Sequence, residues 1–175
     1  SAGSLPADMS AAASGPCLFT LTDVRFVAEG RDIVAPVTLE LHPARIVGLV
    51  GPNGSGKSTL IKMLARQLPP TRGEIRFGDR PLDAFGARDF ARHVAYMPQF
   101  TPPAEGITVR ELVALGRFPW HGALGRFTEA DGGKVERALA LTDLSGLAER
   151  LVDSLSGGER QRAWLAMMLA QDTNC

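Results

Sequence analysis

Residues 51–58 combine the residue types and the spacing of a loop that binds phosphate. Its glycines let backbone N–H groups turn inward around phosphate oxygens, in conformations that a larger side chain would obstruct. We expect Lys57 to bring its cation to the β- and γ-phosphates of a nucleotide, Ser58 to offer a hydroxyl to Mg²⁺, and Thr59 to reach the α-phosphate. The alternative is an ordinary glycine-rich turn with a surface lysine. The loop consists of Gly51, Pro52, Asn53, Gly54, Ser55, Gly56, Lys57 and Ser58.

The segments on either side of this loop are those that a phosphate-binding loop requires. Residues 46–50 form a continuous apolar run too short for a helix, which predicts a strand buried on both faces of a sheet. Residues 57–67 place their apolar side chains on one stripe and precede two prolines, which predicts a helix. The positive N-terminal end of that helix would face the phosphates. This strand–loop–helix order favours phosphate binding over an ordinary turn.

A second candidate anion site lies further along the chain. Ser156 and Glu159 have the spacing of a capping box, and Gly157 and Gly158 fall at the first helical positions. The apolar run 163–170 continues the predicted helix. The pattern predicts a helix N-terminus with bare backbone N–H groups, which favours an anion. On these four residues alone, an ordinary well-capped helix is the simpler interpretation.

The full string of the second site decides between these interpretations. Residues 155–162 read LSGGERQR and resemble the signature motif of ATP-binding-cassette ATPases, and they follow a loop that reads GPNGSGKST. Tyr96-Met97-Pro98-Gln99, at the end of a strand predicted over 94–97, resembles the Q-loop of that family. The resemblance implies that Gln99 contacts Mg²⁺ and the attacking water; without it, Gln99 would be read as a solvated loop residue. It covers residues 18–175, roughly the first two-thirds of such a cassette.

The resemblance implies an α/β fold, a P-loop NTPase of the cassette type with a mixed sheet, an antiparallel β subdomain and a helical subdomain that holds the signature. The helical subdomain is expected over about 101–165, in a domain that spans 18–175 and is incomplete at its C-terminus. Strands are predicted over the segments 18–27, 37–41 and 74–77, by their content of strand formers. Helices are predicted from Thr108 to Gly116 and from Thr128 to Leu141, with an aromatic loop at 118–122 between them.

The resemblance also implies partners and cofactors. Two copies of the chain would pair head to tail as a homodimer, with ATP and Mg²⁺ held between Lys57 of one chain and Ser156, Gly157 and Gly158 of the other. A polytopic permease of the bacterial inner membrane would dock near Gln99, on the cytoplasmic side, and a periplasmic binding protein would act indirectly. The chain would therefore be a peripheral membrane-associated subunit that itself touches no transported molecule.

The helical segment narrows the class of transporter. Residues 106–127 resemble the corresponding stretch of iron-chelate importers, in particular of the ferric hydroxamate siderophore type, and residues 150–154 and 162–164 agree. The resemblance implies an ATPase that powers siderophore import. The alternatives are the ATPase of a cobalamin or other metal-chelate importer, and a cassette ATPase that acts on nucleic acid. The aromatic residues in this segment are equally expected as helical-subdomain core or as permease contacts; they are Phe118, Trp120 and Phe127.

Composition limits the remaining classes. The 19 Lys+Arg balance 19 Asp+Glu, so the chain lacks the basic footprint of a nucleic-acid-binding protein. Two cysteines make no disulfide framework, and no apolar run approaches the roughly 18 residues that span a bilayer. Residues 1–17 have neither a cationic nor an apolar region of a secretory signal, and are predicted to be a disordered tail.

Two departures from the family pattern carry expectations of their own. Ala28 stands where these cassettes usually carry an aromatic residue that stacks on adenine, so adenine stacking is expected to be weaker or supplied elsewhere. The family also continues after the signature helix into an apolar strand that ends in Asp-Glu, the Walker B strand, and then to a switch histidine. No apolar run of this chain ends in Asp-Glu. We therefore expect a portion of a longer ATPase that binds nucleotide without hydrolysing it.

Overall fold

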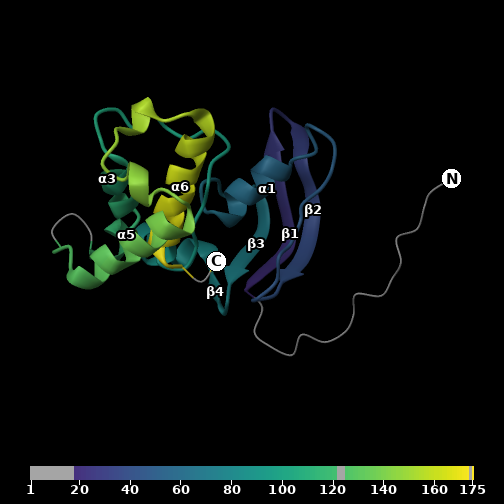
Figure 1. Ribbon diagram of the computed structural model, residues 1–175. Coiled ribbons are helices and arrows are strands. Elements are labelled where there is room, and N and C mark those ends of the chain that lie inside the picture. The colour runs from purple at the N-terminus through teal and green to yellow at the C-terminus, as the bar shows by residue number, and fades with distance from the viewer. Residues whose placement is uncertain (1–17, 122–124, 174) are drawn as a thin grey trace. The chain divides into compact units, whose positions relative to one another are not determined.

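In the computed structural model, the described residues are 18–121, 125–173 and 175, and they fall into two compact units (Figure 1). The first unit ends at Ala84 and the second runs from Phe85 to Cys175. The predicted disordered tail, residues 1–17, lies outside the described residues. Among the helices described, none combines the length and the apolar composition needed to cross a membrane.

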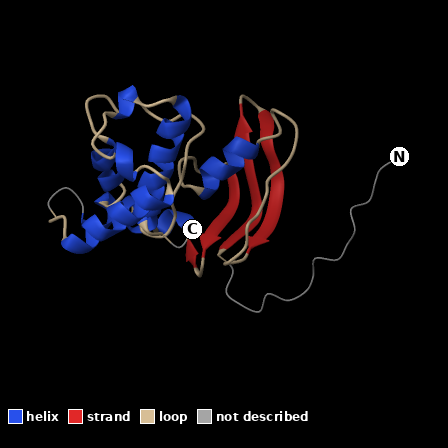
Figure 2. Cartoon of the chain, viewed as in Figure 1, coloured by secondary structure: helices blue, strands red, loops and turns tan. Residues whose placement is uncertain are grey.

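The first unit is built around a four-stranded antiparallel sheet in the order β2-β1-β3-β4 (Figure 2). Leu21 of β1 pairs in register with Leu39 of β2 and with Ile75 of β3, and both Leu21 and Ile75 are buried. The three strands predicted here are confirmed, although the second starts at Arg31 rather than at Val37. The strands are β1 (Phe19–Ala28), β2 (Arg31–Leu41), β3 (Arg72–Phe77) and β4 (Arg80–Pro81).

Helix α1 (Lys57–Leu64) follows the glycine-rich loop directly, as predicted, and packs against β2. Its buried side chains are Leu60 and Met63. The helix ends at its C-cap residue Ala65, short of the predicted end, because Arg66 adopts a left-handed φ of 59° that an α-helix cannot include. The buried side chains of α1 therefore lie in the two turns of helix directly after the loop.

Two predicted strands are wrong. Residues 46–50 and 94–97 have no strand conformation, and the exposed fractions of Ile46 and Val50 are 105% and 90%. A strand needs a neighbour for its backbone N–H and C=O groups, and neither segment belongs to the sheet that the described residues form. Within the described part of the chain, the segment that leads into the glycine-rich loop is thus an exposed connection, and the sheet is antiparallel throughout.

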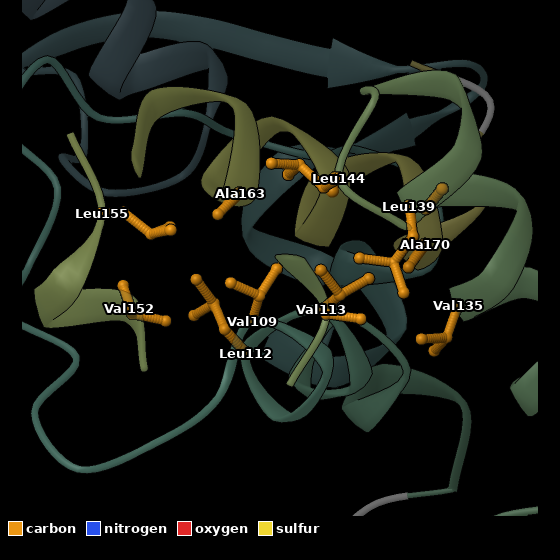
Figure 3. Packing of buried hydrophobic residues seen from close by; sticks show 13 residues of the cluster. Val109, Leu112, Val113, Val135, Leu139, Leu144, Val152, Leu155, Ala163 and Ala170 are labelled. Atoms are coloured by element: carbon orange, nitrogen blue, oxygen red, sulfur yellow. The ribbon is translucent and has the colours of Figure 1, made fainter. Parts of the chain in front are cut away.

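The second unit packs α3 (Val109–Leu115), α5 (Glu129–Leu141) and α6 (Gly157–Gln171) around one apolar core (Figure 3). At Gly116, a Cβ would lie 2.1 Å from the backbone oxygen of Met167, so only glycine allows α3 and α6 to approach this closely. The unit also contains the short helices α2 (Ala87–Ala91) and α4 (Phe118–His121). The core residues are Val109, Leu112, Val113, Val135, Ala138, Leu139, Leu144, Ala148, Val152, Leu155, Ala163, Ala166 and Ala170.

Short 3₁₀ helices complete the described elements, at Leu82–Ala84, Ser145–Leu147 and Val152–Ser154. The capping boxes predicted at Thr108 and Ser156 are confirmed, and Thr128 forms a further one with Asp131. The predicted aromatic loop at 118–122 is wrong over 118–121, which form α4, while Gly122 lies outside the described residues. Backbone carbonyls of α4 accept hydrogen bonds from the Arg92 guanidinium, which stabilises this short turn.

A buried ion pair links the helices of the second unit. Arg117 and Asp131 are 7% and 6% exposed, and Arg117 Nε lies 2.8 Å from Asp131 Oδ1. The same guanidinium donates through Nη1 to the carbonyl of Ala170 at 2.8 Å. The other carboxylate oxygen accepts from the backbone N–H and the hydroxyl of Thr128 at 2.9 and 2.7 Å. The pair is therefore satisfied on both sides, as a buried charge must be.

We expect the stability of the second unit to fall at low pH because of Asp131. Hydrogen bonds from the Thr128 hydroxyl and backbone lower the pKa of Asp131 from 3.8 to about 2, and Arg117 adds to this against the effect of burial. Because the folded-state pKa is depressed, the carboxylate stabilises the fold above about pH 4 and this contribution is lost as the pH falls through about 2.

The contribution at neutral pH is on the order of 2 kcal/mol of unfolding free energy. Urea denaturation at a series of pH values measures it, with Asp131→Asn as the comparison because asparagine does not titrate. We expect the two stability curves to converge as the pH approaches 2. Curves that stay parallel over this range would contradict the assignment to Asp131.

Candidate functional site

The glycine-rich loop is shaped by two glycines in left-handed conformations. Gly54 and Gly56 have φ values of 82° and 83°, which side chains rarely adopt. At Gly56 a Cβ would also lie 2.3 Å from the carbonyl oxygen of Ile33, so the loop rests directly on β2. Gly51 has no such φ, but a Cβ there would meet Ser55 Oγ at 3.0 Å. The backbone conformation therefore favours glycine at positions 54 and 56, and close approach requires it at 56, whereas a small shift of the Ser55 side chain would accommodate a Cβ at position 51.

The lysine of the loop lies over the loop itself. Lys57 Nζ donates to the carbonyl oxygens of Gly51 and Pro52 at 2.8 and 2.6 Å. Phosphate oxygens are stronger acceptors than carbonyls because they are charged, so a bound phosphate would compete for this ammonium group. The residue next to it, Ser58, is exposed, and Thr59 is half-buried.

The N-terminus of α1 leaves room for an anion. Its N-cap residue, Gly56, offers no side-chain hydrogen bond to the first amides of the helix. No acidic residue stands in the first turn of α1. The first N–H groups of a helix and its dipole favour negative charge, and here no carboxylate of the first turn competes for them. Residues 51–59, called the phosphate cradle below, therefore form a largely exposed loop in the first unit whose chemistry suits a phosphate.

At the second predicted anion site, unlike at the start of α1, a carboxylate already accepts hydrogen bonds at the helix N-terminus. The Ser156 N–H and hydroxyl donate to Glu159 Oε2 at 2.8 and 2.7 Å, and the Ser156 oxygen accepts from the Glu159 N–H. The hydrogen bond from the Ser156 hydroxyl, followed by the one from its backbone N–H, lowers the pKa of Glu159. A Cβ added at Gly157 or Gly158 would meet nothing within 4 Å among the described residues. The described part of the chain therefore gives no steric reason for glycine at these two positions.

Gln99, the third part of the predicted site after the loop and the signature motif, is exposed in a bend of the second unit. The structure thus gathers residues 51–59 in the first unit, while Gln99 and the signature residues 156–158 belong to the second. Sequence reasoning missed two contributors to these segments. They are the Ile33 carbonyl under Gly56 and the Gln171 side chain, which bonds to the segment before Gln99. No local pattern in the sequence signals either contact.

Comparison with known proteins now identifies the family. The family described as ABC transporter matches residues 34–175. The chain belongs to the ABC transporter family. Membership implies a nucleotide-binding domain, which agrees with the phosphate cradle of the first unit. The resemblance that the motifs carry is confirmed.

The relatives of this ABC transporter chain include import ATP-binding proteins. It is 44% identical to a petrobactin import ATP-binding protein of Bacillus anthracis over 142 residues, and these residues make up 81% of the chain and 52% of the relative. It is 38% identical over 143 residues to an iron(3+)-hydroxamate import ATP-binding protein of Bacillus subtilis (strain 168), covering 82% and 53%. The chain therefore spans about half the length of these curated relatives.

A solved structure shows the same fold. The structure of an ATP-binding subunit of an ABC transporter matches with a TM-score of 0.76 at 24% identity, over 89% of this chain and 63% of that one. This likeness confirms the predicted α/β cassette fold. It says nothing about cargo.

Proposed function

We propose that this chain is the ATP-binding part of a subunit that powers the import of a ferric siderophore through an ABC transporter, by binding and hydrolysing ATP. The observation that carries the proposal is the phosphate cradle of residues 51–59, with Lys57 over the loop and the uncapped N-terminus of α1 behind it. The names of the two relatives, which concern petrobactin and iron(3+)-hydroxamate import, support the transport class.

The residues present fit a nucleoside triphosphate and its magnesium ion. The loop offers left-handed glycines, free helix amides and one ammonium group, which together match phosphate oxygens. The Ser58 hydroxyl would hold Mg²⁺, with Gln99 as a second ligand or as the group that orients the attacking water. Bound Mg²⁺ would neutralise phosphate charge. The role of Lys57 is to hold the β- and γ-phosphate oxygens in place.

A second copy of the chain is the proposed partner at the nucleotide. The support is the signature helix: Gly157 and Gly158 stand at its exposed N-terminus, and nothing within the described chain requires them to be glycine. A close approach by a ligand would require it. Ser156, Gly157 and Gly158 of one chain would then face the γ-phosphate held by Lys57 of the other, in a head-to-tail homodimer.

We expect Gly157→Asp to separate these two roles. A Cβ at this position meets nothing within 4 Å among the described residues, and an acidic residue at the start of a helix is favourable. Folding and ATP binding by the monomer should therefore stay within about twofold of the unchanged chain. ATP-dependent dimerisation should be lost because the carboxylate repels the γ-phosphate. Analytical ultracentrifugation with Mg²⁺-ATP measures the second effect. A loss of ATP binding by the monomer itself would contradict the role in trans.

The transport partners follow from the same proposal. A polytopic permease of the bacterial inner membrane would dock on the helical subdomain, about 101–165, near Gln99, and a periplasmic binding protein would deliver the cargo. The subunit would be peripheral, on the cytoplasmic side. The two relatives are named for different chelates, so a hydroxamate is one candidate cargo beside other metal chelates and cobalamin. The balanced charge of 19 basic and 19 acidic residues disfavours the alternative of an ATPase that acts on nucleic acid.

The proposal is tested by nucleotide binding to the purified chain. Equilibrium dialysis with Mg²⁺-ATP should show saturable binding to one site per chain. Competition by Mg²⁺-GTP should be nearly as strong as by ATP, because Ala28 offers no aromatic ring to stack on adenine. Phosphate release is expected to be absent, since no apolar run of the chain ends in Asp-Glu. A chain that binds no nucleoside triphosphate would refute the proposed function.

A further inference from the structure

The C-terminal end of α6, the helix that begins at the signature motif, is bonded to segments distant in the sequence. Gln171 is the last residue of this helix. Its side-chain Nε2 donates to the carbonyl oxygens of Ala91 and Val94, the latter at 3.4 Å. Its own backbone carbonyl accepts from Trp120 Nε1 at 2.6 Å. One residue therefore joins α6 to both α2 and α4.

The segment held in this way leads to Gln99. Residues 92–98 contain no helix or strand, so their backbone groups need other partners. The amide of Cys175 donates to the carbonyl of His93 at 3.0 Å, and the amide of Ala95 donates to the carbonyl of Cys175 at 2.7 Å. The end of α6 and Cys175 thus supply partners for the backbone of residues 93–95, whereas the amides of residues 92–94 bond to the carbonyls of Asp89 and Phe90.

The end of α6 is itself fixed in the second unit. Arg117 Nη1 donates to the carbonyls of Ala170 and Gln171 at 2.8 and 3.3 Å. A cation at the C-terminus of a helix is favourable because the last carbonyls carry partial negative charge. Since Arg117 is also paired with buried Asp131, the helix end cannot shift without breaking a buried ion pair.

Helix α6 joins the signature motif to Gln171. Its 15 residues make a rod about 22 Å long, with the signature residues at one end and Gln171 at the other. Among the hydrogen bonds of the described residues, none joins exposed Gln99 directly to α6, so Gln171 supplies the contact between this helix and the segment before Gln99.

We propose that Gln171 is a positioning residue that holds residues 91–95 against the end of α6 and thereby sets where Gln99 stands. The inference rests on the proposed function, in which Gln99 acts at the Mg²⁺ of bound ATP. A merely structural Gln171 would affect the stability of the second unit but not the magnesium-dependent part of ATP binding.

The experiment compares ATP affinity in Mg²⁺ with ATP affinity in EDTA, for the chain of 175 residues. Gln171→Leu removes the donor while keeping most of the side-chain volume. We expect it to reduce the gain in affinity from Mg²⁺ about 2- to 12-fold, the range for the net loss of one hydrogen bond, and to leave the affinity in EDTA unchanged. The change should add nothing in a Gln99→Ala background, since both act on one step. Gln67→Leu, at an exposed position of the first unit, is the matched control and should behave as the unchanged chain.

Gln171→Glu is the second variant, in case the leucine disturbs packing. It has the same size, but its carboxylate cannot donate to the two carbonyls, so it should reproduce the loss. Failure of the unchanged chain to bind ATP would defeat the proposed function itself. If the unchanged chain binds, three results overturn only the positioning role: an unaltered magnesium gain in both Gln171 variants, an equal loss in EDTA, or a magnesium gain that Gln99→Ala does not reduce.

Discussion

Replacing Lys57 by alanine is expected to weaken binding of Mg²⁺-ATP to the chain about 10- to 150-fold, the range for losing charge-assisted hydrogen bonds to phosphate. The ammonium group now donates to the carbonyls of Gly51 and Pro52 at 2.8 and 2.6 Å, which shows that it reaches the mouth of the loop. In the complex with a triphosphate, charged phosphate oxygens would replace these neutral carbonyls as acceptors for the ammonium group. Isothermal titration calorimetry with ATP measures the loss.

The matched control for this change is Lys62→Ala. Lys62 lies in the last turn of the same helix and is exposed, so its loss removes the same charge without touching the loop. We expect its ATP affinity to stay within about twofold of the unchanged chain, because exposed charges are screened by salt. Similar losses in both variants would mean that the general field of α1, rather than the loop contact of Lys57, holds the phosphates.

The largest expected effect on stability follows from removing Arg117. Arg117→Ala leaves the carboxylate of Asp131, 6% exposed, without its buried partner and takes a donor from the carbonyl of Ala170. Breaking one side of a buried ion pair costs about 3–5 kcal/mol of unfolding free energy. Urea denaturation followed by circular dichroism measures the loss.

The same chain offers an exposed ion pair as a control. Arg110 contacts Glu136 and Glu149 on the surface of the second unit, with side chains 40%, 58% and 76% exposed. Arg110→Ala should therefore cost less than about 1 kcal/mol. If the two arginine variants lose equal stability, burial of the Arg117–Asp131 pair does not set its contribution.

Local patterns accounted for the starting points of α3 and α6. The capping boxes of Thr108 with Glu111 and of Ser156 with Glu159 join residues three apart, so their hydrogen bonds follow from sequence spacing alone. The glycine-rich loop is equally local, because its turn depends on residues that lie beside one another. These motifs also carried the family resemblance, which the comparisons confirmed.

Patterns of hydrophobicity were less reliable where pairing had to be assumed. The apolar run 46–50 has the composition of a buried strand, yet it lies exposed because no strand pairs with it in the described part of the chain. Residues 118–121 were expected as a loop, yet they form α4, whose backbone carbonyls accept hydrogen bonds from Arg92. Composition indicates which residues are favourable to bury, but not which strand or helix is available to cover them.

The sequence by itself determined the phosphate loop, the signature motif and the helices that begin at them. Only the tertiary structure decided that Gly56 must rest on the Ile33 carbonyl, that Arg117 pairs with Asp131 at the end of α6, and that Gln171 holds the segment before Gln99. The physical reason is distance along the chain. Gln171 and Ala91 are 80 residues apart, and a hydrogen bond between such residues depends on how the helices pack rather than on any spacing in the sequence.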